Sequence, residues 1–176
     1  MLVMSTLRPR CAARQGAMGA IRGFTLIELV VSITVLAIIV GLALPSFRAF
    51  VANQRIRNAS FDLMAALTLA RSEAITRGVP VNLQKTQTTW DQGWTVKDTI
   101  SGQFIQIQDA YNSLTITDSA SLAAITYNKD GRATAASSTK FTVALPTAIN
   151  GVSSRCISIG LSGVPSSSVL ASGGTC

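Results

Sequence analysis

The sequence predicts an α+β protein in which one long N-terminal helix packs on an antiparallel β-sheet. A run of 21 mostly apolar residues, 24–44, is long enough to cross a bilayer as a helix, because twenty residues rise about 30 Å. Helical spacing of apolar residues then continues to Arg77, where Gly78 and Pro80 predict a helix stop. Beyond Gly78, short β-rich runs alternate with turn residues.

The apolar run carries a single acid, Glu28. A carboxylate in lipid costs about 2.5–3.5 kcal/mol on insertion scales, so it normally has a partner. Residues 22–29 read RGFTLIEL, which resembles the N-terminus of type IV prepilins. The resemblance implies that a prepilin peptidase cleaves between Gly23 and Phe24 and N-methylates Phe24. It also implies that Glu28 guides filament assembly by pairing with the N-terminal amine of a neighbouring subunit. The alternative role for Glu28 is a solvated interfacial acid.

On this interpretation residues 1–23 are a cleaved leader, and residues 24–44 form the transmembrane and filament-core helix. Met18 offers an alternative start with a six-residue leader, and both starts give the same mature protein. A competing interpretation is a conventional secretory signal cleaved after Ala43, since Gly41 and Ala43 are small. Glu28 inside the apolar run argues against that interpretation.

The formal net charge of +7 is concentrated in the leader. Four of the 15 basic residues precede the cleavage site, so the mature chain keeps 11 basic and eight acidic residues, a net charge of +3. By the positive-inside rule the leader arginines hold the N-terminus in the cytoplasm. We therefore expect a single-pass protein of the bacterial inner membrane with a periplasmic C-terminal domain, and no strong nucleic-acid binding.

Residues 45–77 predict an amphipathic continuation of the same helix. Pro45 predicts a kink, because proline removes a helical hydrogen bond and crowds the preceding turn. An apolar stripe with a spacing of three to four residues follows, formed by Phe47, Phe50, Val51, Ala59, Leu63, Ala66, Leu67, Ala70 and Ala74. A helix that is apolar all round and then on one side only suits a filament core that carries a globular domain.

Residues 78–176 predict a β-rich periplasmic head with one sheet of six or seven strands. The expected strands are residues 79–85, 93–98, 103–109, 113–117, 124–128, 140–145 and 155–161, with tight turns at Asp130-Gly131 and Asn150-Gly151. Cys156 and Cys176 are the two cysteines that remain after cleavage. In an oxidising compartment they predict a disulfide, with two free thiols as the alternative. Such a bond would pin the Ser/Gly-rich tail, residues 162–175, which is otherwise expected to be flexible.

Three further stretches resemble the GspH/FimT family, which comprises H-type pseudopilins and FimT/FimU minor pilins. They are residues 69–81, LARSEAITRGVPV, residues 90–94, WDQGW, and residues 125–132, ITYNKDGR. Read physically, Arg71 and Glu73 are surface charges, Arg77 lies at the helix C-terminus, and the two tryptophans cover the sheet. We expect structural roles for all of them.

The chain has no histidine, nucleophile elbow, phosphate loop, metal-ligand spacing or compact acidic cluster. We therefore expect no catalysis, cofactor or metal. The resemblance implies a structural subunit that assembles with other pilins: a minor pilin for filament initiation or tip assembly, an H-type pseudopilin of type II secretion, or a DNA-binding tip pilin. The cysteine-closed C-terminal tail resembles the tails of FimU/FimT-like proteins, which favours a role in the pilus over a role in secretion. A Gly-Arg-x-Arg pattern marks the DNA-binding relatives, whereas residues 160–163 here read GLSG.

Overall fold

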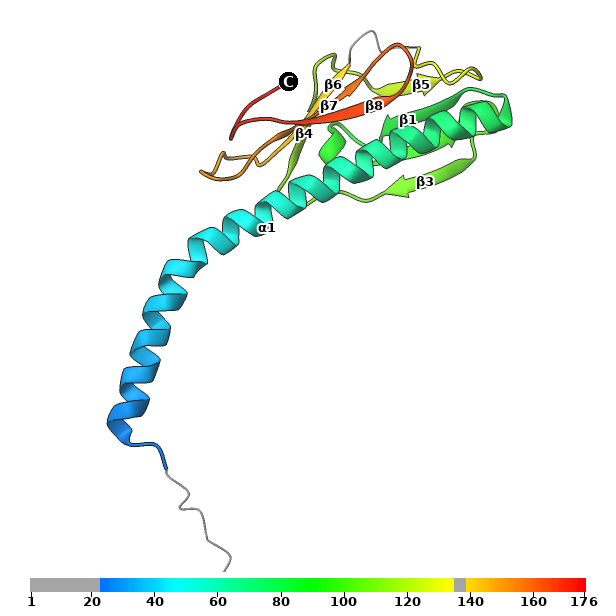
Figure 1. The fold of residues 1–176 in the computed structure, drawn as a ribbon. Coiled ribbons are helices and arrows are strands. Elements are labelled where there is room, and N and C mark those ends of the chain that lie inside the picture. Colours follow the sequence, from blue (N-terminus) through cyan, green and yellow to red (C-terminus); the bar gives the residue numbers. More distant parts are fainter. Residues whose placement is uncertain (1–22, 135–138) are drawn as a thin grey trace, which may run out of the picture. The chain divides into compact units, whose positions relative to one another are not determined.

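The computed structural model describes residues 23–134 and 139–176, so the predicted leader lies outside the described residues except for Gly23. Helix α1, Leu26–Arg77, is drawn as one continuous helix in Figure 1. It has 52 residues and contains Pro45. It runs through both units into which the chain divides, which meet at Val40 and Gly41. The kink at Pro45 stays a prediction.

Helix α1 ends where the Gly-x-Pro signal predicted. The Gly78 amide donates to the carbonyl of Ala74 at 3.0 Å, and Gly78 has a φ of 67°. A left-handed residue just beyond the last helical turn closes a helix with this bond, and glycine adopts that conformation without a steric penalty.

The apolar stripe of α1 is buried over its second half. Its buried members are Ile56, Ala59, Ser60, Leu63, Ala66, Leu67, Ala70 and Ala74. The predicted stripe began earlier, but Phe47 and Phe50 are 63% and 62% exposed. The buried stripe therefore begins at Ile56. Alanines dominate it because small side chains let the helix backbone approach the core closely.

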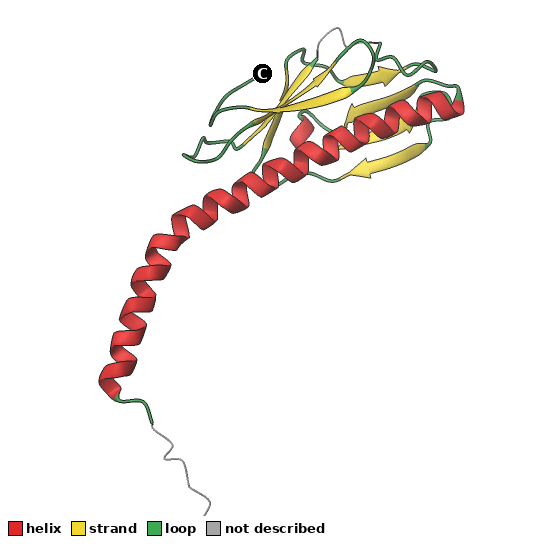
Figure 2. Ribbon diagram, in the orientation of Figure 1, coloured by secondary structure: helices red, strands yellow, loops and turns green. Residues whose placement is uncertain are grey.

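The head contains two four-stranded antiparallel sheets, so the prediction of one sheet is wrong (Figure 2). The first, ordered β3-β2-β1-β5, consists of β1 (Val81–Lys85), β2 (Trp94–Asp98), β3 (Phe104–Gln108) and β5 (Ala124–Tyr127). The second, ordered β4-β6-β7-β8, consists of β4 (Thr115–Asp118), β6 (Lys140–Ala144), β7 (Arg155–Ile159) and β8 (Pro165–Val169). The sheet divides because β5 pairs with β1, while β4 pairs with β6.

The tail contains a strand that the sequence did not predict. Strand β8, Pro165–Val169, pairs with β7 along its whole length, and the hydroxyls of Ser158 and Ser166 lie 2.8 Å apart. Serine is a poor strand former, so pairing with β7 rather than local propensity sets this conformation. Proline is tolerated here because Pro165 opens an edge strand.

One hydrophobic core joins the second half of α1 to both sheets. Its largest fully buried side chains are Trp90, Trp94, Tyr127, Phe141, Ile56, Leu63, Leu67, Leu83, Ile116, Ile125, Ile157 and Ile159. The short 3-10 helix η1, Trp90–Gln92, places Trp90 edge-on to Phe141, with ring centroids 5.1 Å apart. Trp94 lies against Tyr111 at 5.6 Å. Both tryptophans therefore lie inside the core.

Candidate assembly site

The first turn of α1 has a side-chain cap. The Thr25 hydroxyl accepts a hydrogen bond from the Glu28 amide at 3.3 Å, so Thr25 is the N-cap and Glu28 the third helical residue. A threonine followed three residues later by glutamate is the sequence of a capping box, and an acid in the first turn also complements the helix dipole. Thr25 is thus a local structural residue that this Thr-x-x-Glu signal could have revealed.

The first half of α1 offers an apolar surface that the chain itself does not cover. Every residue from Gly23 to Arg48 is exposed, and Phe24, Leu26 and Leu42 are 76%, 81% and 78% exposed. The helix is long and apolar enough to cross a membrane, and none of its most apolar stretch is buried. An apolar helix surface of this size is stable in lipid or against other apolar helices.

Polar groups in this surface are satisfied locally. The hydroxyls of Ser32 and Thr34 each donate to the carbonyl four residues earlier, at 2.7 Å. Glu28 has no such local partner for its carboxylate among the described residues. Within the apolar run 24–44, its carboxylate is therefore available for an interaction with another molecule.

Two polar contacts fix α1 to the loop between β6 and β7. Asn53 donates its side-chain amide to the Gly151 carbonyl at 2.8 Å and accepts the Ser153 amide at 3.0 Å. The side chain thereby imitates a peptide group and holds the predicted Asn150-Gly151 turn. Sequence analysis missed this role, because Asn53 has no local signal for a partner about one hundred positions away.

A second connection joins α1 to both sheets near Gly131 and Gly163. Arg71, predicted to be a surface charge, is half-buried and donates its Nε to the Gly131 carbonyl at 3.0 Å, so that prediction is wrong. The Tyr127 hydroxyl donates to the Gly163 carbonyl at 3.1 Å. A side chain at Gly163 would collide with the Gly131 carbonyl, so the two loops touch through their backbones. Two of the three family-like stretches, 69–81 and 125–132, therefore meet at this point.

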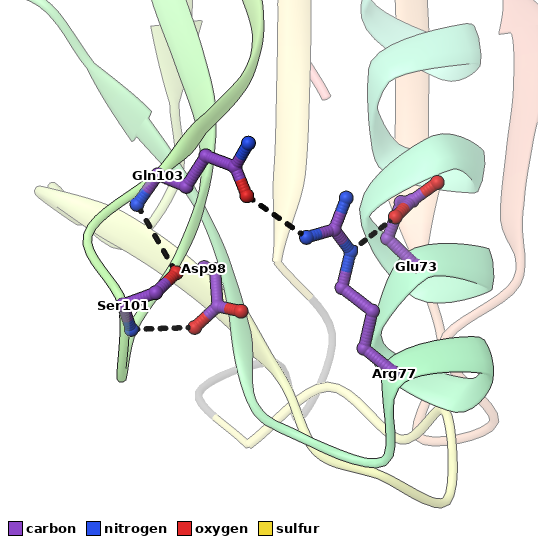
Figure 3. Close-up of polar contacts among 5 residues, drawn as sticks. All are labelled: Glu73, Arg77, Asp98, Ser101 and Gln103. Atoms are coloured by element: carbon purple, nitrogen blue, oxygen red, sulfur yellow. Dashed lines mark hydrogen bonds and ion pairs between the residues drawn. The ribbon is translucent and has the colours of Figure 1, made fainter.

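Arg77 connects the last turn of α1 to the β2–β3 hairpin (Figure 3). It forms an ion pair with Glu73 and donates to the Gln103 side chain at 3.4 Å. In the same hairpin, Asp98 accepts hydrogen bonds from the backbone amides of Ile100 and Ser101 at 2.8 and 3.0 Å. These two amides, with a smaller effect of Arg77, lower the pKa of Asp98 below its ordinary value. A partly exposed ion pair such as Arg77–Glu73 contributes little to stability.

Tyr127→Phe is expected to destabilise the head by about 1 kcal/mol at pH 7, because the Gly163 carbonyl loses its donor. Burial raises the pKa of Tyr127 to about 12, and the Arg71 charge opposes that shift. The neutral phenol therefore contributes stability that is complete below pH 10 and is lost as the pH rises toward 12. Urea unfolding of a soluble fragment, residues 49–176, should show this alkaline loss to be smaller in the variant. An unchanged pH profile would contradict it.

Cys156 and Cys176 form a disulfide in the structure, with Cα atoms 5.5 Å apart. Cys156 is buried on β7, and the Cys176 amide donates to the Thr142 hydroxyl at 3.0 Å. The bond therefore fixes the C-terminus against β6 and β7. Ser172, which donates to the Ile149 carbonyl at 2.9 Å, adds a second attachment.

Cys176→Ser is expected to lower the free energy of unfolding by roughly 3 kcal/mol, the chain-entropy value for a loop of about 20 residues. This variant leaves the buried Cys156 in place and so separates the cross-link from core packing. Non-reducing peptide mapping of the wild-type protein should recover the cross-linked fragment. Both thiols reacting with maleimide under native conditions would contradict the pairing.

Within residues 23–134 and 139–176, no three His, Cys, Asp or Glu side chains converge on a common point. The Tyr111 hydroxyl donates a hydrogen bond to the Asp62 carboxylate at 2.7 Å. Burial, assisted by Asp62, raises the pKa of Tyr111 above its ordinary value, so this phenol stays protonated as a donor. The contact joins α1 to the loop before β4.

Two family models match parts of the chain. Residues 59–163 match the family model of Type II transport protein GspH, and residues 18–44 match the prokaryotic N-terminal methylation motif. No curated protein shows significant sequence similarity to the chain.

Two crystal structures of the type IV minor pilin FimU from Pseudomonas aeruginosa share the fold. The P21 crystal form has 21% identity and a TM-score of 0.57, covering 66% of this chain and 90% of FimU. The P65 form has 22% identity and a TM-score of 0.56, covering 64% and 91%. With the family match extending over more than half of its length, the chain belongs to the GspH family of type IV pilin-like proteins.

Proposed function

We propose that the mature chain is a non-catalytic minor pilin that helps to initiate a type IV pilus or to assemble its tip. One observation carries the proposal: the apolar surface of residues 24–48 is exposed, although Ile56 and seven later residues of the same helix are buried. Lipid covers such a surface before assembly, and neighbouring pilin helices cover it in a filament. The shared fold of a type IV minor pilin supports the pilus assignment.

The N-terminal residues have three proposed roles. Prepilin peptidase cleaves between Gly23 and Phe24, because the methylation motif spans this bond and the chain before Thr25 lies outside α1. Phe24 is then N-methylated and begins the mature chain. Glu28 pairs with the new amine of an adjacent subunit, which neutralises both charges only in the correct register. Before assembly the subunit is held in the inner membrane with its C-terminal head in the periplasm.

The alternative function is an H-type pseudopilin of a type II secretion system. The family model favours it, since its description is that of a type II transport protein. A deletion strain separates the two functions. Loss of surface pili and twitching with normal export of hydrolases supports the minor pilin. Loss of export with normal pili would overturn it in favour of the pseudopilin, and complementation by the wild-type chain is the control.

The soluble domain, from about Gln54, is expected to show no useful binding of duplex DNA at physiological salt. No Lys or Arg occurs from Ile157 to Cys176, while Arg155 lies on β7 and Lys129 and Arg132 lie on a separate turn. Phosphate neutralisation supplies nearly all non-specific DNA affinity, so three dispersed charges give weak, salt-sensitive binding. Fluorescence titration at about 0.15 M salt tests this. Sub-micromolar affinity there would contradict it and favour a role in DNA uptake.

A further inference from the structure

Strand β8 is an edge strand whose outer side has no partner strand among the described residues. It is the last strand of the second sheet, after β7. Just beyond it, the Leu170 amide donates to the Ser154 carbonyl at 2.8 Å, and this bond fixes the phase of the antiparallel ladder. Leu170 and every second residue before it bond to β7, so Ser167 and Val169 direct their backbone amides and carbonyls away from β7.

The edge of β8 lacks the protection that edge strands usually have. Native edges are blunted by charged side chains, by bulges or by covering segments. In the first sheet, β3 has a register shift in its pairing with β2, and β5 is covered where the Thr134 amide donates to the Thr126 carbonyl at 2.8 Å. Strand β8 instead keeps a regular register with β7, and no charged side chain occurs from Ile157 to Cys176. Its backbone groups are therefore open to another strand.

A strand added to this edge would cover an exposed part of α1, which lies beside β8 (Figure 1). Arg155 of β7 is paired with Val169, so the two side chains lie on the same face of the second sheet. That face is turned toward α1, because the Arg155 guanidinium lies 5.8 Å from the centre of the Phe61 ring. Phe61 and Val169 are 54% and 62% exposed. The next strand position, about 4.7–4.9 Å beyond β8, would place alternate side chains over them.

The groove between β8 and α1 is basic. It has a volume of about 350 Å³, is lined by Arg57 and Arg155, and has no acid among its described lining residues. Arg155 donates to the Ser167 hydroxyl at 3.3 Å, whereas Arg57 is exposed and forms no ion pair with the described residues. Guanidinium groups pair best with carboxylates and other oxyanions. An added strand that suits this groove therefore carries an acidic side chain on the face toward α1, next to an apolar one.

The same features argue against β8 of a second copy as the added strand. In an antiparallel self-pairing centred on Ser167, the second copy would bring the uncharged sequence PSSSV and no acid to the two arginines. Pro165 of that copy would lie opposite Val169 and has no amide to donate to the Val169 carbonyl. The groove and the edge together therefore fit a different, acidic partner.

We propose that the head binds an extended acidic segment of a partner protein by strand addition to the free edge of β8. Ser167 and Val169 exchange backbone hydrogen bonds with the added strand. An apolar side chain of that strand covers Phe61, and its carboxylate pairs with Arg57 and Arg155. The site uses only residues of the unit Gly41–Cys176, so it is independent of whether the subunit belongs to a pilus or to a secretion system.

The probe is the peptide Thr-Val-Thr-Glu-Thr-Val-Thr, with a fluorophore at its N-terminus and an amide at its C-terminus. In a strand its glutamate and valines share one face. Fluorescence anisotropy measures its binding to the full mature chain in detergent micelles. The same peptide with methylated backbone amides cannot donate to an edge and should bind at least about tenfold more weakly. A peptide with lysine in place of glutamate should also bind at least about threefold more weakly.

Variants of the chain test the two halves of the site. Ser167→Pro should weaken peptide binding at least about tenfold, because it removes an outward amide and places a ring at the edge. The ladder with β7 should survive, since Pro165 already occupies an equivalent position. Ser167→Ala is the matched control: it also loses the Arg155 contact but keeps the amide, so its affinity should stay within about twofold. Arg57→Gln should weaken binding about threefold, and Arg132→Gln, outside the groove, should change nothing.

Amide hydrogen exchange followed by NMR locates the bound peptide. In the free chain the outward amides of Ser167 and Val169 should exchange faster than those of Ser166 and Ser168, which bond to β7. The peptide should slow exchange at Ser167 and Val169. Unchanged exchange at these two residues would overturn the proposal, and this measurement needs no variant that alters the fold.

Each remaining outcome also decides the proposal. Equal binding of the methylated peptide, or equal losses in Ser167→Pro and Ser167→Ala, would overturn strand addition. Equal binding of the lysine peptide would overturn the acidic partner. A dimer of the wild-type chain in sedimentation, abolished by Ser167→Pro but not by Ser167→Ala, would assign the edge to a second copy and overturn the proposal.

Discussion

Glu28→Ala should leave the protein cleaved, methylated and inserted in the membrane, but reduce its incorporation into filaments at least tenfold. Alanine makes the exposed first half of α1 more apolar, so insertion cannot suffer. The lost interaction is the pairing of the carboxylate with the amine of Phe24 in a neighbouring subunit. In the wild-type chain, pairing relieves the cost of an unpaired acid in lipid, about 2.5–3.5 kcal/mol. The alanine variant lacks this driving force for assembly. A tenfold change in incorporation corresponds to about 1.4 kcal/mol, so the lost driving force is large enough for a tenfold reduction.

Immunoblotting of sheared filaments measures incorporation, and intact-mass analysis of membrane extracts verifies that the mature chain begins with N-methylated Phe24. Ser32→Ala is the matched control, because its hydroxyl donates to the Glu28 carbonyl inside the same helix without bearing charge. Glu28→Gln keeps the size of the side chain and removes its charge, so it should fail like alanine if an ionic pair drives assembly. Normal abundance of Glu28→Ala in filaments would refute the pairing, and a product starting at Leu44 would establish a secretory signal instead.

Trp94→Ala should lower the free energy of unfolding of residues 49–176 by about 3–5 kcal/mol, the usual cost of truncating a buried tryptophan. Trp94 is completely buried and packs against Tyr111, whose hydroxyl donates to Asp62 of α1. The truncation leaves a cavity where β2 meets the helix. Because a domain has only about 5–15 kcal/mol of stability, the variant loses a large share of it.

Urea unfolding followed by circular dichroism measures the effect. Trp94→Phe should cost less than the alanine variant, because it keeps a ring in place and Nε1 has no hydrogen-bond partner among the described residues. Phe104→Ala on the edge strand β3 is the surface control, since Phe104 is 58% exposed and its loss should change stability by less than about 0.5 kcal/mol. Equal effects at Trp94 and Phe104 would contradict the placement of Trp94 in the core.

Local signals in the sequence were sufficient for the helix but not for the sheets. Gly78 and Pro80 ended α1 where expected, because the capping bond from Gly78 to Ala74 spans only four residues. The split into two sheets depends on whether β4 pairs with its neighbour in sequence or with β6, and no periodicity within Thr115–Asp118 encodes that choice. Strand β8 was missed for the same reason, since its serines take their conformation from β7.

The candidate site divides in the same way. Gly23, Phe24 and Glu28 are recognisable because the motif is contiguous. Arg71 was misjudged as a surface charge because its acceptor, Gly131, is a backbone carbonyl sixty positions later. A groove lined by Arg57 of α1 and Arg155 of β7 has no sequence signature, since a helix residue and a strand residue become neighbours only when α1 packs on the second sheet.

The contact between Gly131 and Gly163 sets a limit on which sequences this fold tolerates. Both residues have a positive φ, 73° and 75°, and a methyl group on Gly163 would meet the Gly131 carbonyl and the Tyr127 ring. Leu161 and Ser162, exposed in the same β7–β8 loop, face no such restriction. A saturation library of residues 160–164 should therefore accept nearly any substitution at positions 161 and 162 and reject every one at 163. The loop is free to diverge in chemistry while its anchor point is fixed.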